Sequence, residues 1–519
     1  MIRPQSLAYV CTLLLLPLVF LGCGDQLADM NEDPTAATEL EPEPRMTQFQ
    51  LEASGGRFEE WRANLIHASC MIQHLSSPFE VWSGCRYTEN IGYIEAYWDV
   101  QYGSSVQTIE DVMHDLDERL EEEPDLVNLH AATRIMRVFM YQRLTDLYGD
   151  IPYSEAGRGF IDGNSTPAFD PQEEIYMDML NELSEAVDAF EPGARTYGSH
   201  DLLFGGDVEQ WRRYGNSMML RLGMRLSEVD PATAEDYVAQ AIEGGVMESN
   251  DDIAYIDHQS GPDGINRYGV GEVFEDFWAG AGHGFRISDT LMDKMLDAEN
   301  DGDNIDPRVN RISALYEEDD GGDIVLQSED PADFAGLPNG LTSGEVEDLD
   351  DPLAFNIPHR DNIGNYEAPN LWMSYAEVEF LLAEAALRGW GNTSSAQEHY
   401  ENGIRAAMEH MTIYGADPIP DEEITSYIDN APEASMETVL TQKWKAFFTN
   451  GYEAWSEWRR TGYPELDPVD FPGNVTGGEI PRRLKYPAEE EANNRANYEA
   501  ALDRQGPDEL TTRMWWDVE

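Results

Sequence analysis

Apolar residues recur at helical spacing through most of this chain, and that spacing limits the folds open to it. Between Leu129 and Leu147 they return every three to five residues, which marks one face of a helix that ends at Gly149. A second such stretch covers Pro171–Phe190, and a third follows Asp207, whose carboxylate suits an N-cap. Helical patterns dominate after residue 45, so the sequence predicts an all-α fold.

The clearest pair of helices lies in the second half of the chain. Ser374 and Glu377 form a capping-box pattern before an apolar stretch that ends at Gly389, and a second helical stretch begins near Ser394. Two antiparallel helices of this length, with small residues between them, are similar to a tetratricopeptide unit of about 34 residues. We therefore expect a tetratricopeptide-like helical scaffold.

Residues 250–370 interrupt the helical pattern. Asp, Gly, Asn and Pro are frequent there, yet aromatic residues remain. A long irregular segment inside a helical body is usually functional or disordered. The aromatic residues favour long ordered loops packed on the helices. We therefore predict a single helical domain with long irregular loops over residues 46–519.

The first residues form a separate unit. Arg3 precedes an almost wholly apolar run up to Leu21, which is shorter than the stretch of about 20 residues that spans a bilayer. A positively charged N-terminus, a short apolar run and a small residue before the cleavage site are typical of a secretory signal peptide. Gly22–Cys23 resembles a bacterial lipobox, which predicts removal of residues 1–22 and a lipid on Cys23. The alternative is an ordinary signal peptide with a chance cysteine.

Residues 23–45 are polar and rich in Pro and acidic residues. They predict a tether with little to bury, which would hold the body away from a membrane. No later apolar run reaches membrane-spanning length, so we expect membrane contact through the lipid only. Cys70 and Cys85 could pair outside the cytoplasm, but two isolated cysteines do not make a zinc site.

The charge of the chain is strongly negative. There are 101 Asp and Glu against 33 Lys and Arg, which gives −68, and only four of the basic residues are lysines. Such a field repels phosphates and anionic membrane surfaces, which argues against nucleic-acid binding. Carboxylate repulsion destabilises a compact state in dilute salt and is screened at about 1 M salt. We interpret this acidic, lysine-poor composition as a halophilic surface.

Seven local strings resemble one family and occur in its expected order. They are RLTDLYGDIPYSEA at 143–156, FDPQEEIYMDMLNEL at 169–183, GGDVEQWRRYGNSMMLRLGMRLS at 205–227, YAEVEFLLAEAALRGW at 375–390, TQKWKAFFTNGYEAWSEWRRTGYPEL at 441–466, IPRRLKYPAEEEANNRANYEAA at 480–501 and TTRMWWD at 511–517. With Cys23 and the string NEDP at 31–34, they resemble the SusD/RagB family, specifically its SusD-like nutrient-binding outer-membrane lipoproteins. The resemblance covers nearly the whole mature chain.

The resemblance implies a function as well as a fold. Members are mostly helical, with tetratricopeptide-type helix pairs, and sit on the cell-surface side of the outer membrane through their lipid. They act as a lid on a SusC-like TonB-dependent transporter and deliver glycans or, in some branches, peptides. The resemblance implies no enzyme and no cofactor. Other classes remain open: a lipid-anchored protein–protein scaffold, or a surface hydrolase, although no catalytic motif singles out any residue.

Aromatic residues beside polar groups are the candidates for a ligand site, because sugars bind by stacking on rings and by hydrogen bonds to their hydroxyls. Two irregular segments, residues 76–92 and 255–280, carry such residues. The predicted ligand-binding residues are Trp82, Arg86, Tyr87, Asn90, Tyr268 and Trp278. We expect them to lie in loops over one end of the helical scaffold.

Two further clusters have a structural and a functional interpretation. The basic residues Lys443, Lys445, Arg459 and Arg460 would form an anion site or, as we favour, ion pairs with Glu453, Glu457 and their neighbours. The acidic run from Asp297 to Gly302 is similar to the start of a calcium loop, but the twelfth position is Arg308 instead of Glu. We therefore predict no metal site.

Overall fold

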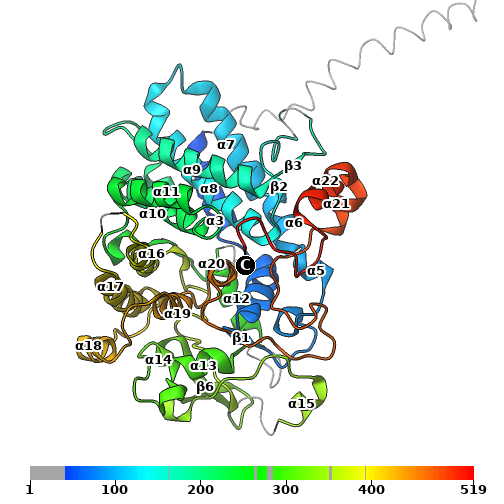
Figure 1. The fold of residues 1–519 in the computed structure, drawn as a ribbon, viewed down its shortest axis with the longest axis vertical. Coiled ribbons are helices and arrows are strands. Elements are labelled where there is room, and N and C mark those ends of the chain that lie inside the picture. Colours follow the sequence, from blue (N-terminus) through cyan, green and yellow to red (C-terminus); the bar gives the residue numbers. More distant parts are fainter. Residues whose placement is uncertain are drawn as a thin grey trace, which may run out of the picture.

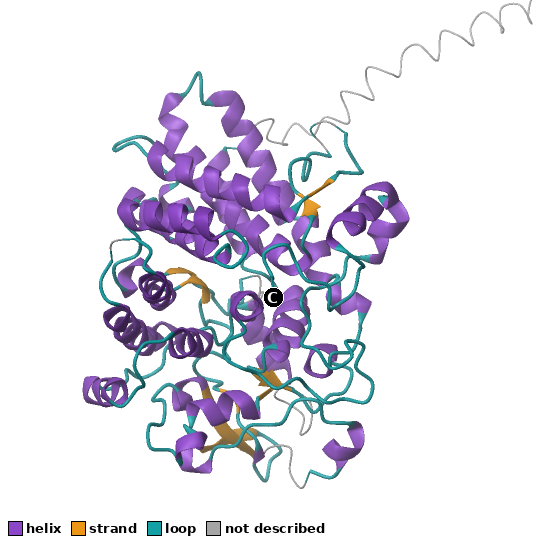
Figure 2. Cartoon of the chain, viewed as in Figure 1, coloured by secondary structure: helices purple, strands orange, loops and turns teal. Residues whose placement is uncertain are grey.

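The computed structural model describes residues 41–159, 161, 163–261, 266–277, 284–349, 354–391 and 393–518. Within them the fold is mostly helical, with strands that are short and few (Figures 1 and 2). This confirms the predicted fold class. None of the described helices is both long and apolar enough to cross a membrane. The predicted signal peptide and Cys23 lie outside the described residues.

Six helices build the first part of the scaffold, in the upper half of Figure 1. They are α3 (Pro42–Ala53), α7 (Ser105–Arg119), α8 (Val127–Tyr148), α9 (Gln172–Ala189), α10 (Val208–Arg225) and α11 (Pro231–Gly244). From α7 to α11 each helix packs on the next along the chain. The predicted signals are confirmed: the Asp207 carboxylate accepts the N–H groups of Glu209 and Gln210, and Gly149 ends α8 with φ 87°.

Five further helices form the second part, on the left of Figure 1 and near its centre. They are α16 (Tyr375–Arg388), α17 (Ala396–Glu409), α18 (Asp421–Asp429), α19 (Met436–Ala446) and α20 (Gly451–Thr461). The α16–α17 pair is the predicted tetratricopeptide-like unit. Ser374 Oγ accepts the N–H of Glu377 at 3.1 Å. A Cβ on Gly403 would lie 2.6 Å from the Phe380 ring, so only glycine permits this close packing.

The body of the fold begins before residue 46. Helix α3 starts at Pro42, inside the last residues of the predicted tether, and Arg45 is buried. Its guanidinium pairs with Asp111 at 2.8 Å and with Asp115 at 2.5 Å on α7. The acidic and proline-rich composition concealed this helix because its stability comes from packing on α7, which composition does not record.

Residues 250–370 contain more regular structure than the sequence predicts. Short antiparallel sheets pair β4 (Ala254–Ile256) with β9 (Asn370–Met373), and β6 (Ser313–Glu318) with both β7 (Ile324–Ser328) and β8 (Ile357–Pro358). Helices in this part of the chain are α12 (Gly269–Phe277), α13 (Asp289–Met295), α14 (Val309–Ile312) and α15 (Ser343–Glu347). Strands this short carry too few residues for their period to show in the sequence.

The remaining elements are short and lie on the right side of Figure 1 or near its centre. Two strand pairs join distant segments: β1 (Leu75–Ser76) with β5 (Arg286–Ile287), and β2 (Ile151–Pro152) with β3 (Phe169–Asp170). The helices are α4 (Arg57–Glu59), the π-helix η1 (Glu60–Ser69), α5 (Ile91–Ile94), α6 (Ala96–Gly103), α21 (Ala488–Asn493) and α22 (Arg495–Gln505), with a 3₁₀ turn, η2, at Ser83–Arg86.

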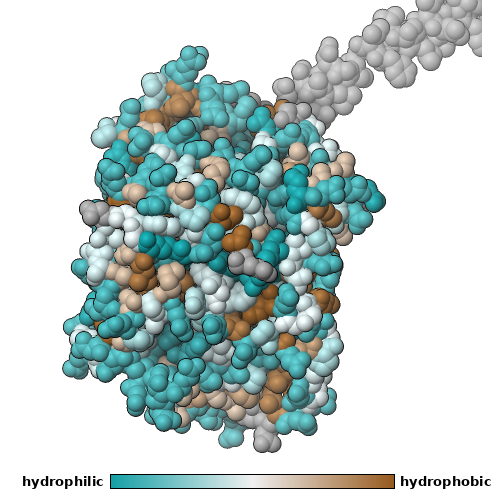
Figure 3. Space-filling view, viewed as in Figure 1, coloured by the Kyte–Doolittle hydropathy of each residue, from teal (hydrophilic) through white to brown (hydrophobic). Residues whose placement is uncertain are grey.

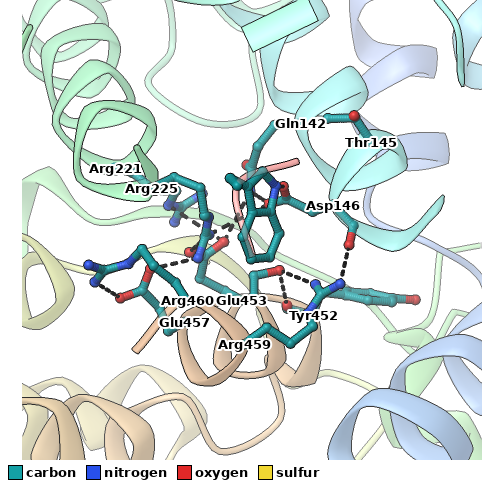
Figure 4. A network of polar contacts seen from close by, with 12 residues as sticks. Gln142, Thr145, Asp146, Arg221, Arg225, Tyr452, Glu453, Glu457, Arg459 and Arg460 are labelled. Atoms are coloured by element: carbon teal, nitrogen blue, oxygen red, sulfur yellow. Dashed lines mark hydrogen bonds and ion pairs between the residues drawn. The ribbon is translucent and has the colours of Figure 1, made fainter. Parts of the chain in front are cut away.

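A buried ion-pair hub joins the two parts of the scaffold at helices α10, α16, α19 and α20. Figure 4 shows its members Arg221, Arg225, Glu453, Glu457 and Arg460. The hub consists of Arg221, Arg225, Lys443 and Arg460 with Glu377, Glu384, Glu453 and Glu457. Arg221 pairs with Glu377 at 2.6 Å, Arg460 with Glu384 at 2.7 Å, and Lys443 with Glu457 at 2.8 Å. The predicted ion pairs are confirmed for Lys443 and Arg460, which both pair with Glu457. Lys445 instead lies 3.5 Å from Asp306.

Three of the four hub carboxylates stay charged although they are buried, because nearby cations outweigh burial and lower the pKa of Glu384, Glu453 and Glu457. Burial raises the pKa of the fourth, Glu377, although Arg221 opposes that rise. Burial alone would raise the pKa of Glu457, but Arg460, Lys443 and Arg225 together hold that pKa well below its usual range. Arg459 does not share this pairing: its guanidinium donates to the backbone oxygens of Asp146 at 2.6 Å and Arg482 at 3.0 Å. The hub ion pairs and the hydrogen bonds of Arg459 thus hold α8, α10, α16, α19 and α20 together.

Candidate functional site

A cluster of aromatic and arginine side chains lies at the surface where the chain enters η1. Arg57 and Phe58 belong to α4, Trp61 and Arg62 to the start of η1, and Tyr93 to α5. Phe58 is 48% exposed, and the other four side chains are half-buried. These five residues are called the aromatic platform. Exposed rings of this kind can stack on the face of a ligand ring.

The Arg62 guanidinium holds the platform together. Its carbon lies 3.6 Å from the centre of the Phe58 ring, 4.6 Å from the Trp61 ring and 5.3 Å from the Tyr93 ring. Arg62 Nη1 also donates to the backbone oxygen of Phe58 at 2.9 Å. Stacking on aromatic faces fixes the plane of a guanidinium and leaves further N–H donors along its edge. Flat rings and fixed donors therefore share one surface.

Trp82, predicted to stack on a ligand, lies beneath this platform. It is 1% exposed and stacks on Phe285 with ring centres 4.2 Å apart. The Trp61 ring lies at 77° to the Trp82 ring, with ring centres 6.2 Å apart. A row of aromatic rings thus runs from the core to the surface. Trp82 supports Trp61 from below and has almost no surface of its own to offer a ligand.

Arg86 and Tyr87 are also interior residues. Arg86 donates to the backbone oxygens of Leu341, Phe79 and Ser77 at 2.7, 3.1 and 3.0 Å, and burial lowers its pKa to about 10. Tyr87 is fully buried and has φ 53°. These contacts fasten the segment around η2 to the loop at Leu341. Both residues therefore belong to the core below the platform and do not face solvent.

The other predicted residues have three different positions. Asn90 occupies the N-cap position of α5 without a side-chain capping bond and is half-buried. Its backbone oxygen accepts the N–H of Tyr93 at 3.0 Å, so it lies at the platform's edge. Tyr268 is 3% exposed and lines a water-sized internal cavity of about 10 Å³. Trp278 lies outside the described residues. Of the six predicted residues, the structure therefore brings Trp82 and Asn90 to the platform, one below it and one beside it.

A disulfide fixes the segment below the platform. Cys70 at the end of η1 is joined to Cys85 in η2, and both are fully buried. The pairing that the sequence left open is therefore present. A crosslink that closes a loop of this length restricts the unfolded chain and stabilises the fold by about 3 kcal/mol. It keeps Trp82, which lies inside the loop, in place under Trp61.

An open cavity of about 560 Å³ lies on the other side of α12 from the platform. Its lining combines two tyrosines, three carboxylates and smaller polar groups: Tyr366, Tyr414, Glu275, Asp361, Glu367, Asn365, Ser260, Ile413 and Gly415. The Arg267 guanidinium lies 4.3 Å from the centre of the Tyr366 ring. Carboxylate and amide groups beside rings suit the hydroxyls and faces of a sugar.

Two glycines place this cavity next to the platform. A Cβ on Gly269 would lie 2.8 Å from the backbone oxygen of Gly55, in the turn before α4. A Cβ on Gly271 would lie 2.0 Å from the backbone oxygen of Asn365, which lines the cavity. The first turn of α12 is therefore wedged between the two features. Platform and cavity are therefore two candidate ligand features, each next to α12.

Glu59 lies at the base of the platform with an unusual protonation equilibrium. Its side chain is buried, and Oε1 accepts the N–H of Gly56 at 2.6 Å. Burial is the largest cause that raises its pKa to about 7, and the nearby Glu60 acts in the same direction. A carboxyl group that is partly neutral near pH 7 avoids placing a bare charge beneath exposed rings.

The described part of the chain contains no group of three or more His, Cys, Asp or Glu side chains placed to hold a metal ion. In the acidic run that is similar to a calcium loop, Asp297 bonds Asn300 Nδ2 at 2.7 Å and the N–H of Asn304 at 2.9 Å. Its carboxylate therefore stabilises the turn by accepting these hydrogen bonds.

The sequence reading missed the platform residues. Phe58 and Trp61 stand three residues apart in the string RFEEWR, with an arginine on each side. Spacing of three places both rings on one helical face. The sequence therefore shows two rings on one helical face, but aromatic residues on a helix are more often part of a core. Only their exposure in the structure distinguishes a core position from a binding surface.

The fold and this surface define a class of protein: a binding protein built on tetratricopeptide-like helix pairs, with an aromatic surface beside its loops. A family model described as "Starch-binding associating with outer membrane" matches residues 35–487. The chain therefore belongs to the SusD-like family, whose members are non-catalytic binding proteins of the outer membrane. No curated protein sequence matches the chain.

Solved structures agree with this membership. A structure named as a chitin-binding protein is 32% identical, with a TM-score of 0.80, and the match covers 92% of this chain and 100% of that one. A chitin-binding SusD homolog from Flavobacterium johnsoniae is 25% identical, with a TM-score of 0.72 and coverage of 92% and 98%. A SusD homolog from Bacteroides uniformis shares the fold at 23% identity, with a TM-score of 0.76 and coverage of 93% and 100%.

Proposed function

We propose that this chain is a cell-surface lipoprotein that binds an oligosaccharide and delivers it to a SusC-like TonB-dependent transporter in the outer membrane. The observation that carries the proposal is the aromatic platform, with rings and guanidinium groups fixed at one surface. The two relatives named as chitin-binding make oligomers of N-acetylglucosamine the first ligand to test. The acetamido groups of such a ligand offer carbonyl acceptors to Arg62 and Arg57.

The proposal is tested by titration calorimetry with oligomers of N-acetylglucosamine. Trp61→Ala removes a central ring and should weaken binding about tenfold or more, because truncation of an aromatic hot spot often costs more than about 1–2 kcal/mol. Leu387→Ala is the matched control, since Leu387 is 38% exposed on α16 and outside the platform. Circular dichroism checks that both variants fold.

Four results would reject this assignment. Unchanged affinity of a folded Trp61→Ala variant would remove the platform from the site. Binding of peptides but of no glycan would favour the peptide-binding alternative within the family. A chain that binds neither class but retains a protein partner would be the lipid-anchored scaffold, and hydrolysis of a bound ligand would favour a surface hydrolase.

The anchoring part of the proposal rests on Cys23. Cys23→Ala should leave the chain without lipid and release it from the membrane fraction, because acyl chains contribute about 0.8 kcal/mol for each buried CH₂. Cell fractionation of a strain without the transporter measures this, with the unmodified chain as the control. A Cys23→Ala protein that still fractionates with the outer membrane would overturn the lipoprotein assignment.

A further inference from the structure

A second cavity lies away from the platform, between the α13–η6 segment and helices α18 and α19. Its volume is about 260 Å³, close to the lower bound of about 300 Å³ for drug-sized ligands. The 3₁₀ turn η6 spans Ala298–Asn300. The lining is Asp293, Lys294, Asp297, Ala298, Glu299, Asn300, Asn304, Tyr400, Tyr427, Asn430, Pro432, Glu437, Thr438, Thr441, Gln442 and Lys445. It shares no residue with the platform or with the cavity beside α12 and is called the lysine pocket.

Lysine makes this pocket unusual. The chain has only four lysines against 101 acidic residues, and two of the four, Lys294 and Lys445, line this one cavity. The other two are paired, Lys443 with Glu457 at 2.8 Å and Lys485 with Glu89 at 2.7 Å. Lys294 is half-buried and has no ion pair with any described residue. Acidic residues are expected in the lining of any cavity of this chain, whereas two lysines in one cavity are not.

The floor of the pocket carries an excess of positive charge. Lys445 is 8% exposed, and its ammonium lies 3.5 Å from Asp306 and 3.5 Å from the Tyr427 hydroxyl. Asp306 is already paired with Arg308 at 2.6 Å and is fully buried. Two cations and one carboxylate leave a net charge of +1 in the interior. A buried charge without a full counter-charge is costly, so an anion in the cavity would be stabilising.

The electrostatics of Lys445 agree with this count. Burial is the main cause that lowers its pKa to about 8, and the charges of Arg308 and Lys294 act in the same direction, while Asp306 opposes them. Lys294 and Lys445 therefore lie close enough to repel one another. An anionic group placed between two ammonium groups would relieve that repulsion through charge-assisted hydrogen bonds.

The rim limits which anion fits. Four acids line the pocket, the exposed Asp293, Glu299 and Glu437 and the half-buried Asp297, and they would repel a group with several negative charges. Hydroxyl and amide groups make up much of the remaining wall: Asn304, Asn430, Thr438, Thr441, Gln442 and the two tyrosines. Such a wall hydrogen-bonds the hydroxyls of a ligand that carries a single carboxylate.

We propose that the lysine pocket binds a sugar acid of one ring, with its carboxylate between Lys445 and Lys294 and its hydroxyls on the amide and acidic rim. The ligand would be a monoanion of monosaccharide size. This site is independent of the platform, so its failure would leave the proposed oligosaccharide binding untouched. The long-range field of the chain opposes any anion, and the test is therefore made in molar NaCl, where that field is screened.

The experiment is titration calorimetry of the full mature chain with glucuronate, glucose and acetate. Glucuronate should bind at least tenfold more tightly than either of the others, because it alone has both the carboxylate and the hydroxyls. Lys294→Met should weaken glucuronate binding about tenfold or more, as loss of a hydrogen bond to a charged group does. Lys485→Met is the matched control and should leave the affinity unchanged.

Three outcomes would overturn the proposal. Equal binding of glucuronate and glucose would remove the role of the lysines, and equal binding of acetate would remove the role of the hydroxyl-binding rim. Equal losses in Lys294→Met and Lys485→Met would show a general charge effect instead of a site. Lys445→Met is the second pocket variant, and Lys294→Met carries the test alone if Lys445→Met fails to fold.

Discussion

The ion-pair hub and the aromatic platform use the same arginine side chain in opposite ways. In the hub, Arg460 is fully buried and pairs with Glu384 and Glu457 at 2.7 and 2.8 Å. In the platform, Arg62 is half-buried and lies over three aromatic rings. The hub satisfies its charges internally and holds helices together, whereas the platform keeps donors and ring faces at the surface.

The difference shows where this acidic chain concentrates its few cations. Most of the 33 basic residues are arginines, and those of the hub neutralise carboxylates that could not otherwise be buried. The surface is left with an excess of acid, and the face in Figure 3 is mostly hydrophilic with apolar side chains in small separate patches. An arginine that stacks on rings at such an acidic surface therefore favours a ligand-binding role for that surface.

The largest effect is expected from salt, because repulsion between carboxylates adds up over the whole surface. The midpoint of thermal unfolding should rise from dilute buffer to about 1 M NaCl, as the screening length falls to about 3 Å. Scanning calorimetry at a series of NaCl concentrations measures this. The hub should contribute little to the change, since buried pairs are screened much less. Equal midpoints in both conditions would contradict the halophilic interpretation.

Removal of one hub cation should be the most damaging single substitution. Arg460→Met leaves Glu384 and Glu457 with fewer partners in the interior, and loss of one partner of a buried pair costs about 3–5 kcal/mol. The free energy of unfolding from denaturant titration measures it. Arg495→Met is the control: that side chain is 66% exposed beside Glu499, and exposed pairs contribute about 1 kcal/mol or less. Similar losses in both variants would remove the distinction between hub and surface.

The platform should show its own pH dependence through Glu59. Its pKa rises from 4.5 to about 7 on folding, so the folded state holds the proton more tightly than the unfolded one. The stability from that proton is complete below pH 4.5 and is lost as pH rises through about 7, at most about 3 kcal/mol for this shift. Relative to the unmodified chain, Glu59→Gln should therefore gain stability between pH 5 and 8.

Denaturant titration across that pH range measures the difference between the two proteins. The exposed residue Glu121 provides the control, and Glu121→Gln should follow the unmodified chain at every pH. Burial also lowers the pKa of His67 to about 4, which makes the stability of every variant fall in acid. The comparison therefore uses differences between variants. A constant difference between Glu59→Gln and the unmodified chain would refute the raised pKa.

Local signals in the sequence predicted much of the scaffold. Ser374 caps α16, Asp207 caps α10 and Gly149 ends α8, because each of these effects depends on a few adjacent residues. The ion pairs around Arg460 were also predicted, since opposite charges one helical turn apart must lie near one another. The small sheets of residues 250–370 were not, because their strands are too short for a period to show and because β4 and β8 pair with strands far away in the chain.

The candidate site shows the limit of such signals. Trp82 stands in a segment rich in Ser, Pro and Gly, which predicts an exposed loop, yet the Cys70–Cys85 disulfide and the contacts of Arg86 draw it into the core. Phe58 and Trp61 stand on a helix, which favours burial, yet Phe58 is exposed. Exposure depends on what packs against a residue, and those neighbours come from distant segments.

The sequence alone determined the helical class, the helix ends and the excess of negative charge, because these follow from neighbouring residues and from composition. The tertiary structure decided which rings reach the surface and which arginines find carboxylates. It also brought Lys294 within reach of Lys445, 151 positions further along the chain by their numbers. Contacts between distant segments are fixed by packing of the whole chain, and no local pattern records them.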